Sequence, residues 1–387
     1  MSDLPFTVLQ YTVHWLMVTE SWLYREILSL PESVTSYVVC ERLLDYESYP
    51  VPNLRSLMDE PIVTRFPDKV FRRLGFRQHL DYTVRVARES SARILHSHFG
   101  HVGWSNIGAA GKARVAHVVS FYGTDASRLP GVDRRWRSRY ADLFATARLI
   151  LCEGPHFANR LVALGCPADK ITINPLGVPV SGIHAVSRTV ANSEKLKILI
   201  AATFLEKKGL PDAIEALGRL KRSGIDFQLT IMGDATPEKR SQNEKERILA
   251  ALKENGLFGQ TRLLGYKPRQ ILLEEAYGHH IFLSPSRTSG DGDTEGGAPV
   301  TLIEMAATGM PVVSTRHCDI PSRVIDGVTG LLADEGDVGG LFGHLATLAR
   351  NPDLITSMGG AGRDLVERKF DASKLGLKLA AIYGGIL

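Results

Sequence analysis

The feature of this sequence that most limits its fold is the regular alternation of short apolar segments with helical ones. Segments with strand character occur in the first half at residues 7–13, 36–40, 93–99, 115–121, 149–152 and 171–173, and helical stretches between them include 22–30 and 133–145. Strands that alternate with helices form parallel sheets covered on both faces. The pattern therefore predicts an α/β protein.

The alternation breaks once, at residues 181–195, which are polar, lack an apolar period and are predicted to be a linker. A second alternation follows, with strands expected at 196–202, 227–233, 262–265, 281–284 and 312–315 and helices at 211–221, 238–255, 271–277, 341–350 and 352–369. A chain of 387 residues is longer than one core usually supports. We predict two doubly wound, Rossmann-like domains facing a central cleft, 1–182 and 183–371, and a final helix, 372–387, that returns toward the first domain.

Composition fits a globular protein in a reducing compartment. The chain is 44% hydrophobic and 23% charged, and its four cysteines stand far apart with no CxxC pair. No basic residue precedes Arg25, so the start does not resemble a secretory signal. No apolar run approaches the roughly 20 residues that span a bilayer. We expect a cytoplasmic protein.

Charge is uneven along the chain. Residues 61–140 contain fifteen Lys/Arg against five Asp/Glu, and four basic residues recur at helical spacing beside apolar ones: Lys69, Arg72, Arg73 and Arg77. This pattern predicts a basic amphipathic helix that could make a peripheral contact with an anionic membrane. A solvated helix face is the alternative. Nucleic acid is not expected as a partner, because the patch lacks a recognisable binding module.

Residues 294–311 read as a glycine loop that leads into a short helix. Pro299 suits the first helical position, and Gly309 suits a left-handed cap at the helix end. Gly296 and Gly297 would then leave bare backbone N–H groups at the positive end of a helix. Such an end is a ready seat for phosphate.

Two carboxylates accompany this loop: Glu295 precedes the glycines and Glu304 lies on the helix. Carboxylates accept hydrogen bonds from hydroxyl groups. Other strand-end loops of the second half carry glycine or polar residues, at 206–209, 233–234, 265–266 and 285–287. Ligands of doubly wound sheets bind outside the carboxyl ends of the strands. The sequence therefore indicates one site there, for a sugar nucleotide.

Several segments together resemble the retaining glycosyltransferases of family 4, particularly the group that builds bacterial exopolysaccharide and colanic-acid-type chains. In the second half they are residues 206–209, 282–287, 291–300, 303–306, 309–313 and 326–332, and in the first half 96–100, 120–125 and 175–178. The resemblance implies the GT-B fold. It also implies a UDP- or GDP-linked sugar as donor, a glycan or lipid-linked oligosaccharide as acceptor, and neither a metal nor another cofactor.

The resemblance also assigns roles to residues. Lys208 matches the lysine that binds the diphosphate. Glu295 matches the glutamate that contacts the transferred sugar, and Glu304 matches the glutamate that binds the ribose hydroxyls. Asp125 lies in a first-domain loop that faces the sugar, and Tyr122 stands where the family often has a histidine. We take Lys208, Glu295, Asp125 and Tyr122 as catalytic candidates. The other donor- or acceptor-side candidates are Glu304, Gly296, Gly297, Ala298, Pro299, Val300, Arg287, Gly233, Tyr266, Thr203, Glu20 and His98.

The chain departs from the family pattern in its phosphate-binding residues and its loops. Thr203 replaces the phosphate-binding arginine, so Lys208, helped by Arg287, must supply the positive charge. Eight residues separate the two glutamates, where the family usually has seven. Residues 19–22 resemble the Ser-Glu-Thr-Phe variant of the exopolysaccharide group. The triplet at 291–293 looks like the DxD metal motif of another transferase fold. In this context we interpret it as loop chemistry or a sugar contact.

Structural roles compete with functional ones in the first half. Asp125 could cap the helix that follows it. His98 could be a satisfied histidine at a strand end, and Tyr122 could serve packing alone. His96 and His98 are a poor metal signature without further ligands.

Two other functions remain open from the sequence. One is a UDP-sugar 2-epimerase or a sugar-phosphate phosphorylase on the same scaffold. The other is a non-catalytic subunit that binds sugar nucleotides.

Overall fold

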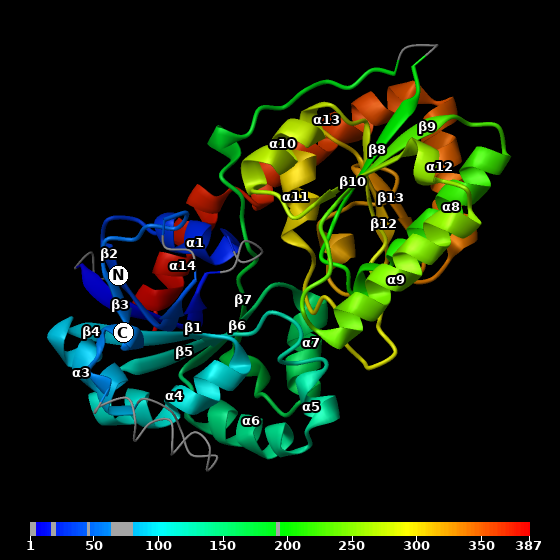
Figure 1. The fold of residues 1–387 in the computed structure, drawn as a ribbon. Coiled ribbons are helices and arrows are strands. Elements are labelled where there is room, and N and C mark those ends of the chain that lie inside the picture. The colour runs from blue at the N-terminus through cyan, green and yellow to red at the C-terminus, as the bar shows by residue number, and fades with distance from the viewer. Residues whose placement is uncertain (1–4, 17–20, 45–46, 63–79, 191–193) are drawn as a thin grey trace. The chain divides into compact units, whose positions relative to one another are not determined.

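The computed structural model describes residues 5–16, 21–44, 47–62, 80–190 and 194–387, which form two compact units (Figure 1). The first unit combines Met1–Gly177 with Ala372–Leu387, and the second is Val178–Asp371. The sequence placed the boundary after residue 182, whereas the structure divides after Gly177. The carboxyl-terminal segment belongs to the first unit.

The first unit contains a seven-stranded parallel sheet in the order β3-β2-β1-β4-β5-β6-β7. Its strands are β1 (Phe6–Trp15), β2 (Val34–Leu43), β3 (Leu54–Ser56), β4 (Ala92–His98), β5 (Ala116–Ser120), β6 (Leu149–Cys152) and β7 (Ile171–Ile173). Leu9 of β1 pairs with Tyr37 of β2 on one side and with Leu95 of β4 on the other. The strand order reverses at β1, so β1 and β4 flank the topological switch point, where ligands of such sheets bind.

Helices cover both faces of this sheet because neighbouring residues of a strand point to opposite sides. Leu9 and Leu95 pack in one cluster with α3 and α4, whereas Val8 and Ile94 pack in another with α14. The helices are α1 (Ser21–Leu28), α3 (Leu80–Glu89), α4 (Gly100–Ala113), α5 (Leu129–Val132), α6 (Arg135–Thr146), α7 (Pro155–Ala163) and α14 (Ala372–Gly384). The end of the chain thus contributes to the core formed by its beginning.

Close backbone contact holds α14 against the first unit. A Cβ on Gly376 would lie 1.8 Å from the carbonyl oxygen of Ser29, which follows α1. Figure 1 shows α14, in red, beside α1. Only glycine permits this approach.

The second unit contains a six-stranded parallel sheet in the order β10-β9-β8-β11-β12-β13. Its strands are β8 (Leu196–Ala201), β9 (Phe227–Met232), β10 (Thr261–Gly265), β11 (Ile281–Ser284), β12 (Val312–Thr315) and β13 (Gly330–Ala333). Its helices are α8 (Leu210–Arg222), α9 (Lys239–Glu254), α10 (Arg269–Tyr277), α11 (Val300–Ala307), α12 (Val338–Arg350) and α13 (Pro352–Lys369). Ile198 and Ile200 face α8 and α9, and Leu199 faces α10 and α11.

The predicted fold class is confirmed: both units are doubly wound parallel sheets. The short strands β3 and β13 were not expected from the sequence. The pattern of β3 is Leu-Arg-Ser, too short for an alternation to be visible.

The segment predicted to be a linker is instead anchored to the second unit. The Arg188 guanidinium is buried and donates to backbone carbonyl oxygens of Val186, Ala276, His279 and Thr308 at 2.6–3.0 Å. A buried guanidinium needs acceptors for its five N–H groups, and carbonyl oxygens of this unit supply them. Residues 191–193 lie outside the described part of the chain.

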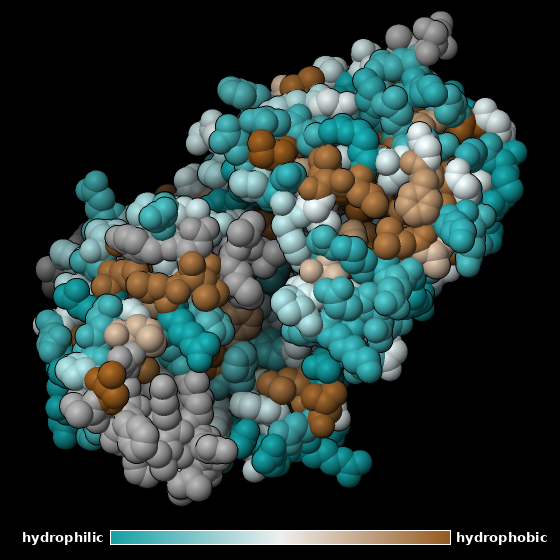
Figure 2. All heavy atoms as spheres, in the orientation of Figure 1, coloured by the Kyte–Doolittle hydropathy of each residue, from teal (hydrophilic) through white to brown (hydrophobic). Residues whose placement is uncertain are grey.

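Figure 2 shows hydrophilic side chains over most of the drawn surface of each unit, with smaller apolar patches between them. Among the described residues, no helix combines the length and the apolar character that crossing a bilayer requires. Lys69, Arg72, Arg73 and Arg77, which carry the predicted basic helix, fall outside the described residues, as does Glu20.

We predict that Gly209→Ala destabilises the protein more than Gly256→Ala does. Both glycines have φ 64°, which costs alanine about 1–2 kcal/mol. A Cβ on Gly209 would also lie 1.9 Å from the carbonyl oxygen of Pro285, whereas the nearest atom at Gly256 is Lys221 Nζ, 3.8 Å away. The additional cost should be ~1–3 kcal/mol. Equal shifts of the urea-unfolding midpoint, followed by circular dichroism, would contradict the steric argument.

Candidate active site

A nearly buried ion pair joins two predicted site residues of the second unit. Lys208 ends the short 3₁₀ helix Glu206–Lys208 after β8, and Glu295 lies in the loop between β11 and α11. The Lys208 ammonium is 2.8 Å from the Glu295 carboxylate, which also accepts a hydrogen bond from Ser286 Oγ at 2.8 Å. Burial alone would raise the pKa of Glu295, but Lys208 and Lys207 together lower it. Glu295 is therefore an anion at neutral pH.

A second cluster of charges fixes the loop that precedes Glu295. The Asp293 carboxylate is buried and lies 3.3 Å from Lys207 Nζ and 2.9 Å from a guanidinium nitrogen of Arg240. Lys207 Nζ also donates to the Thr294 carbonyl oxygen at 3.0 Å. In the DxD-like triplet, Asp293 is thus held by two cations of the protein. The sequence analysis assigned no role to Lys207 or to Arg240.

The expectation of bare N–H groups at the two loop glycines is wrong. Gly296 N–H donates to Thr294 Oγ1 at 3.1 Å, and Gly297 N–H donates to the Glu295 carbonyl oxygen at 2.9 Å. Both bonds are local, because the loop curls back on itself at Gly296, whose φ is 74°. The glycines therefore shape the loop, and their N–H groups are already used.

The helix that follows begins one residue later than predicted. Pro299 is the N-cap, and α11 starts at Val300. Within the described residues, the N–H groups of Val300 and Thr301 have no hydrogen-bond acceptor. The first N–H groups of a helix lack intrahelical partners and carry its positive dipole end. The N–H groups left unbonded at this helix end are thus those of Val300 and Thr301 and not those of the two glycines.

Glu304 is held by a cation that sequence reasoning missed. Its carboxylate lies 2.6 Å from Nε of Arg269, the first residue of α10, and its side chain is 5% exposed. Strands β9 and β8 separate β10 from β11, so strand order alone does not bring the two residues together. Helices α10 and α11 pack in the same core cluster, and this packing does. Tyr266 was selected because it follows the end of a strand. Applying the same rule a few residues further along the chain would have included Arg269.

Arg287 is directed to the first turn of α8. Its guanidinium lies 2.9 Å from Asp212 Oδ2. Its backbone N–H donates to the Lys207 carbonyl oxygen at 2.9 Å, which ties the loop after β11 to the loop after β8. Lys208, by contrast, is paired directly with Glu295.

The remaining second-unit candidates line the ends of β8, β9 and β10. A Cβ on Gly233 would lie 1.9 Å from the Ala202 carbonyl oxygen, so glycine is required there by close packing. Thr203 is a hydrogen-bond partner of the Tyr266 hydroxyl, and Tyr266 is 41% exposed. Burial raises the pKa of Tyr266 despite that hydrogen bond.

His317 is a buried residue at the end of β12 that sequence reasoning also missed. Its Nε2 accepts the Glu295 backbone N–H at 3.1 Å, and its Nδ1 lies 2.6 Å from the Glu335 carboxylate. The imidazole thus connects the Glu295 loop to the segment after β13. The sequence feature that could have identified His317 as a site residue is its position just after an apolar strand.

In the first unit, Asp125 caps a helix, but not the one that follows it. Its Oδ2 accepts the Gly100 N–H of α4 at 2.8 Å, and its Oδ1 accepts the N–H groups of Gly123 and Tyr122 at 3.0 and 3.2 Å. Burial raises the pKa of Asp125, against the opposing effect of the Gly100 N–H. Asp125 is 3% exposed.

His98 and Tyr122 are brought together at the switch point. The Tyr122 hydroxyl lies 2.7 Å from His98 Nδ1, and His98 Nε2 lies 3.0 Å from Gln10 Oε1. Burial lowers the pKa of His98 to about 3, so the imidazole is neutral. It also raises the pKa of Tyr122 well above its usual value.

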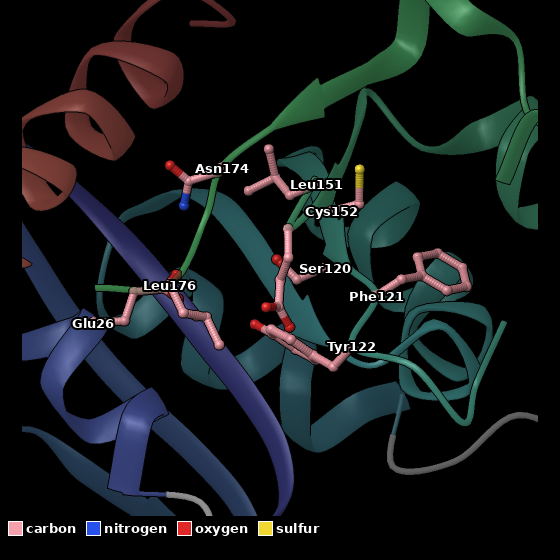
Figure 3. A pocket seen from close by; sticks show the side chains of 9 residues that line it. Glu26, Ser120, Phe121, Tyr122, Leu151, Cys152, Asn174 and Leu176 are labelled. Atoms are coloured by element: carbon pink, nitrogen blue, oxygen red, sulfur yellow. The ribbon is translucent and has the colours of Figure 1, made fainter. Parts of the chain in front are cut away.

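Tyr122 borders a small pocket within the first unit, of about 10 Å³ (Figure 3). Its lining residues are Glu26, Ser120, Phe121, Tyr122, Leu151, Cys152, Glu153, Asn174 and Leu176. Burial raises the pKa of Glu26 to about 7. Asn174 Oδ1 is buried without a hydrogen-bond partner among the described residues. The pocket therefore contains at least one unused hydrogen-bond acceptor.

Comparisons with known proteins agree with the fold. Residues 35–181 match the family described as Glycosyltransferase Family 4, and residues 186–365 match Glycosyl transferases group 1. The amylovoran biosynthesis glycosyltransferase AmsK of Erwinia amylovora is 34% identical over 290 residues, which cover 73% of this chain and 67% of AmsK. A GDP-mannose-dependent alpha-(1-6)-phosphatidylinositol monomannoside mannosyltransferase of Mycolicibacterium smegmatis is 28% identical, covering 78% of this chain and 72% of the relative.

A solved structure shows the same fold over almost the whole chain. HepE of Anabaena, crystallised with UDP and glucose, superposes with a TM-score of 0.79 at 14% identity, covering 98% of this chain and 100% of HepE. This likeness confirms the GT-B architecture expected from the sequence. The two family matches and the similarity to AmsK show that the chain is a glycosyltransferase and belongs to glycosyltransferase family 4.

Proposed function

We propose that this glycosyltransferase moves a sugar, with retention of configuration, from a UDP- or GDP-linked donor to a hydroxyl of a growing glycan. The observation that carries the proposal is the Lys208–Glu295 pair at the carboxyl ends of the second sheet, in the loop that leads to α11. One ammonium, one carboxylate and a helix N-terminus there match the diphosphate and hydroxyl groups of a nucleotide sugar.

The diphosphate has two sources of positive charge in this arrangement. Lys208 contributes a full charge, and the N–H groups of Val300 and Thr301 contribute the partial charge of a helix end. Neither requires an arginine at Thr203. Arg287 lies 2.9 Å from Asp212 and acts mainly on the loop that carries Lys208.

The two glutamates have separate tasks along one extended ligand. Glu295, ionised and held by Ser286 and Lys208, accepts a hydroxyl of the transferred sugar. Glu304, oriented by Arg269, accepts the ribose hydroxyls. Both carboxylates keep lone pairs beyond those used by their protein partners.

Retention follows if the acceptor oxygen attacks the anomeric carbon on the face from which the diphosphate leaves. The bond from that carbon to the diphosphate oxygen breaks, the bond to the acceptor oxygen forms, and the departing phosphate oxygen takes the acceptor proton. Negative charge grows on the diphosphate, so preorganised positive groups accelerate the step. Lys208 and the first turn of α11 supply them without a metal.

The acceptor would bind the first unit, where Tyr122 and His98 lie at the switch point. The name of AmsK supports a role in polysaccharide biosynthesis, and the mycolicibacterial relative is named for a lipid-linked acceptor. We infer a lipid-linked glycan as acceptor. The basic segment of residues 69–77 would then hold the enzyme at an anionic membrane surface.

We predict that Lys208→Ala and Glu304→Ala each lower transfer by about 10²–10³-fold, because each removes a charged contact to the donor. The measurement is initial rate with a panel of UDP- and GDP-linked sugars, scored by acceptor glycosylation and by slow donor hydrolysis. Lys195→Ala serves as the control, since Lys195 is 54% exposed and paired with Asp226 on the same unit. Near wild-type rates in both folded variants would show that the site is misassigned.

We also predict that EDTA leaves the transfer rate unchanged. The charge on the leaving diphosphate is balanced by protein groups in this proposal, so no divalent ion takes part. The assay compares initial rates before and after chelation, and with Mg²⁺ or Mn²⁺ restored. A strict need for added divalent ion would refute the metal-free mechanism.

A further inference from the structure

A chain of buried hydrogen bonds connects Tyr122 to the carboxyl-terminal helix. From Tyr122 it runs through His98 and Gln10, whose Nε2 lies 3.4 Å from the Tyr383 hydroxyl. Tyr383 belongs to α14 and is completely buried. Residues 10 and 383 are thus joined across nearly the full length of the sequence.

The chain then returns to the pocket. The Tyr383 hydroxyl lies 2.7 Å from His96 Nδ1, and His96 Nε2 lies 2.8 Å from Ser120 Oγ. Ser120 lines the same pocket as Tyr122 (Figure 3). Every member other than Tyr122 is at least 96% buried, so the protons cannot exchange partners with bulk water.

The amide of Gln10 sets the direction of the protons on the His98 side. Its Oε1 can only accept, so neutral His98 carries its proton on Nε2 and leaves Nδ1 as an acceptor. The Tyr122 hydroxyl must therefore donate to His98 Nδ1. Its proton points inward, and its oxygen keeps a lone pair for the pocket.

The same logic holds on the Tyr383 side. Gln10 Nε2 donates to the Tyr383 oxygen, so the Tyr383 proton goes to His96 Nδ1. His96 then carries its proton on Nε2 and donates to Ser120. The Tyr383 hydroxyl is hydrogen-bonded to both Gln10 and His96, so it connects the two halves of the chain.

We propose that Tyr383 is a positioning residue for the transfer reaction: through Gln10 and His98 it holds the Tyr122 hydroxyl as a hydrogen-bond acceptor facing the pocket. This inference rests on the proposed function. The pocket volume, about 10 Å³, fits one hydroxyl group. Its unpartnered Asn174 Oδ1 also accepts, so the group it fits is a donor, as an acceptor-sugar hydroxyl is.

The test is Tyr383→Phe, which removes one oxygen and keeps the ring packed against the sheet. In this variant His96 Nδ1 and Gln10 Nε2 lose their partner, and the Gln10 amide is free to turn over. We expect kcat to fall by roughly tenfold to a hundredfold with the donor KM unchanged. The reason is that a misplaced Tyr122 hydroxyl slows the transfer step but does not weaken donor binding. Tyr277→Phe is the matched control, because the Tyr277 hydroxyl also accepts a hydrogen bond, from His184 N–H, but in the second unit.

A readout independent of catalysis is the ¹⁵N spectrum of the histidine rings in the full chain, assigned with His96→Gln and His98→Gln. We expect Nε2–H tautomers at both positions in the wild type, and a changed or mixed His98 tautomer in Tyr383→Phe only. An unchanged His98 signal in Tyr383→Phe, or a kcat equal to that of Tyr277→Phe, would overturn the proposal. Absence of any transfer by the wild type would instead defeat the proposed function, and the His98 spectrum would still decide whether Tyr383 orders the chain.

Discussion

The common direction of the strands is the constraint on which both candidate sites depend. In the described part of the chain, the paired strands of both sheets are parallel, so the carboxyl ends of neighbouring strands lie at one edge. Lys208 after β8 and Glu295 after β11 are separated by 87 residues, yet their strands are adjacent and their side chains meet. The same geometry in the first sheet places Gln10 beside His98.

The buried carboxylates at the candidate site of the second unit are each paired with a cation. Burial of an isolated ion is costly, and opposite charge with hydrogen bonds offsets that cost. Asp293 is held by Lys207 and Arg240, Glu295 by Lys208, and Glu304 by Arg269. These pairs orient the carboxylates and fix the loops that carry them. The first unit uses neutral groups instead. They form a chain of hydrogen bonds in which the proton positions determine which group donates and which accepts.

Periodicity and turn chemistry were enough to predict much of the fold. Strands Ile281–Ser284 and Val312–Thr315 and helix Pro352–Lys369 have the predicted bounds, since their patterns are bordered by proline or glycine. The segment around Arg188 was misread as a linker, because its stability comes from one buried guanidinium and not from an apolar pattern. The N–H groups of Gly296 and Gly297 were misread as free, because local bonds within an irregular loop leave no periodic signal.

The sequence by itself determined the α/β class, the family and the identity of Lys208, Glu295 and Glu304 as candidates, because these reside in local patterns of few residues. Only the tertiary structure decided their partners: Arg269 for Glu304, His317 for the Glu295 loop, and Tyr383 for Gln10 and His96. Such partners are set by strand order, by the packing of helices such as α10 and α11, and by the docking of α14, which bring together residues up to 373 positions apart. No local pattern encodes a contact at that separation.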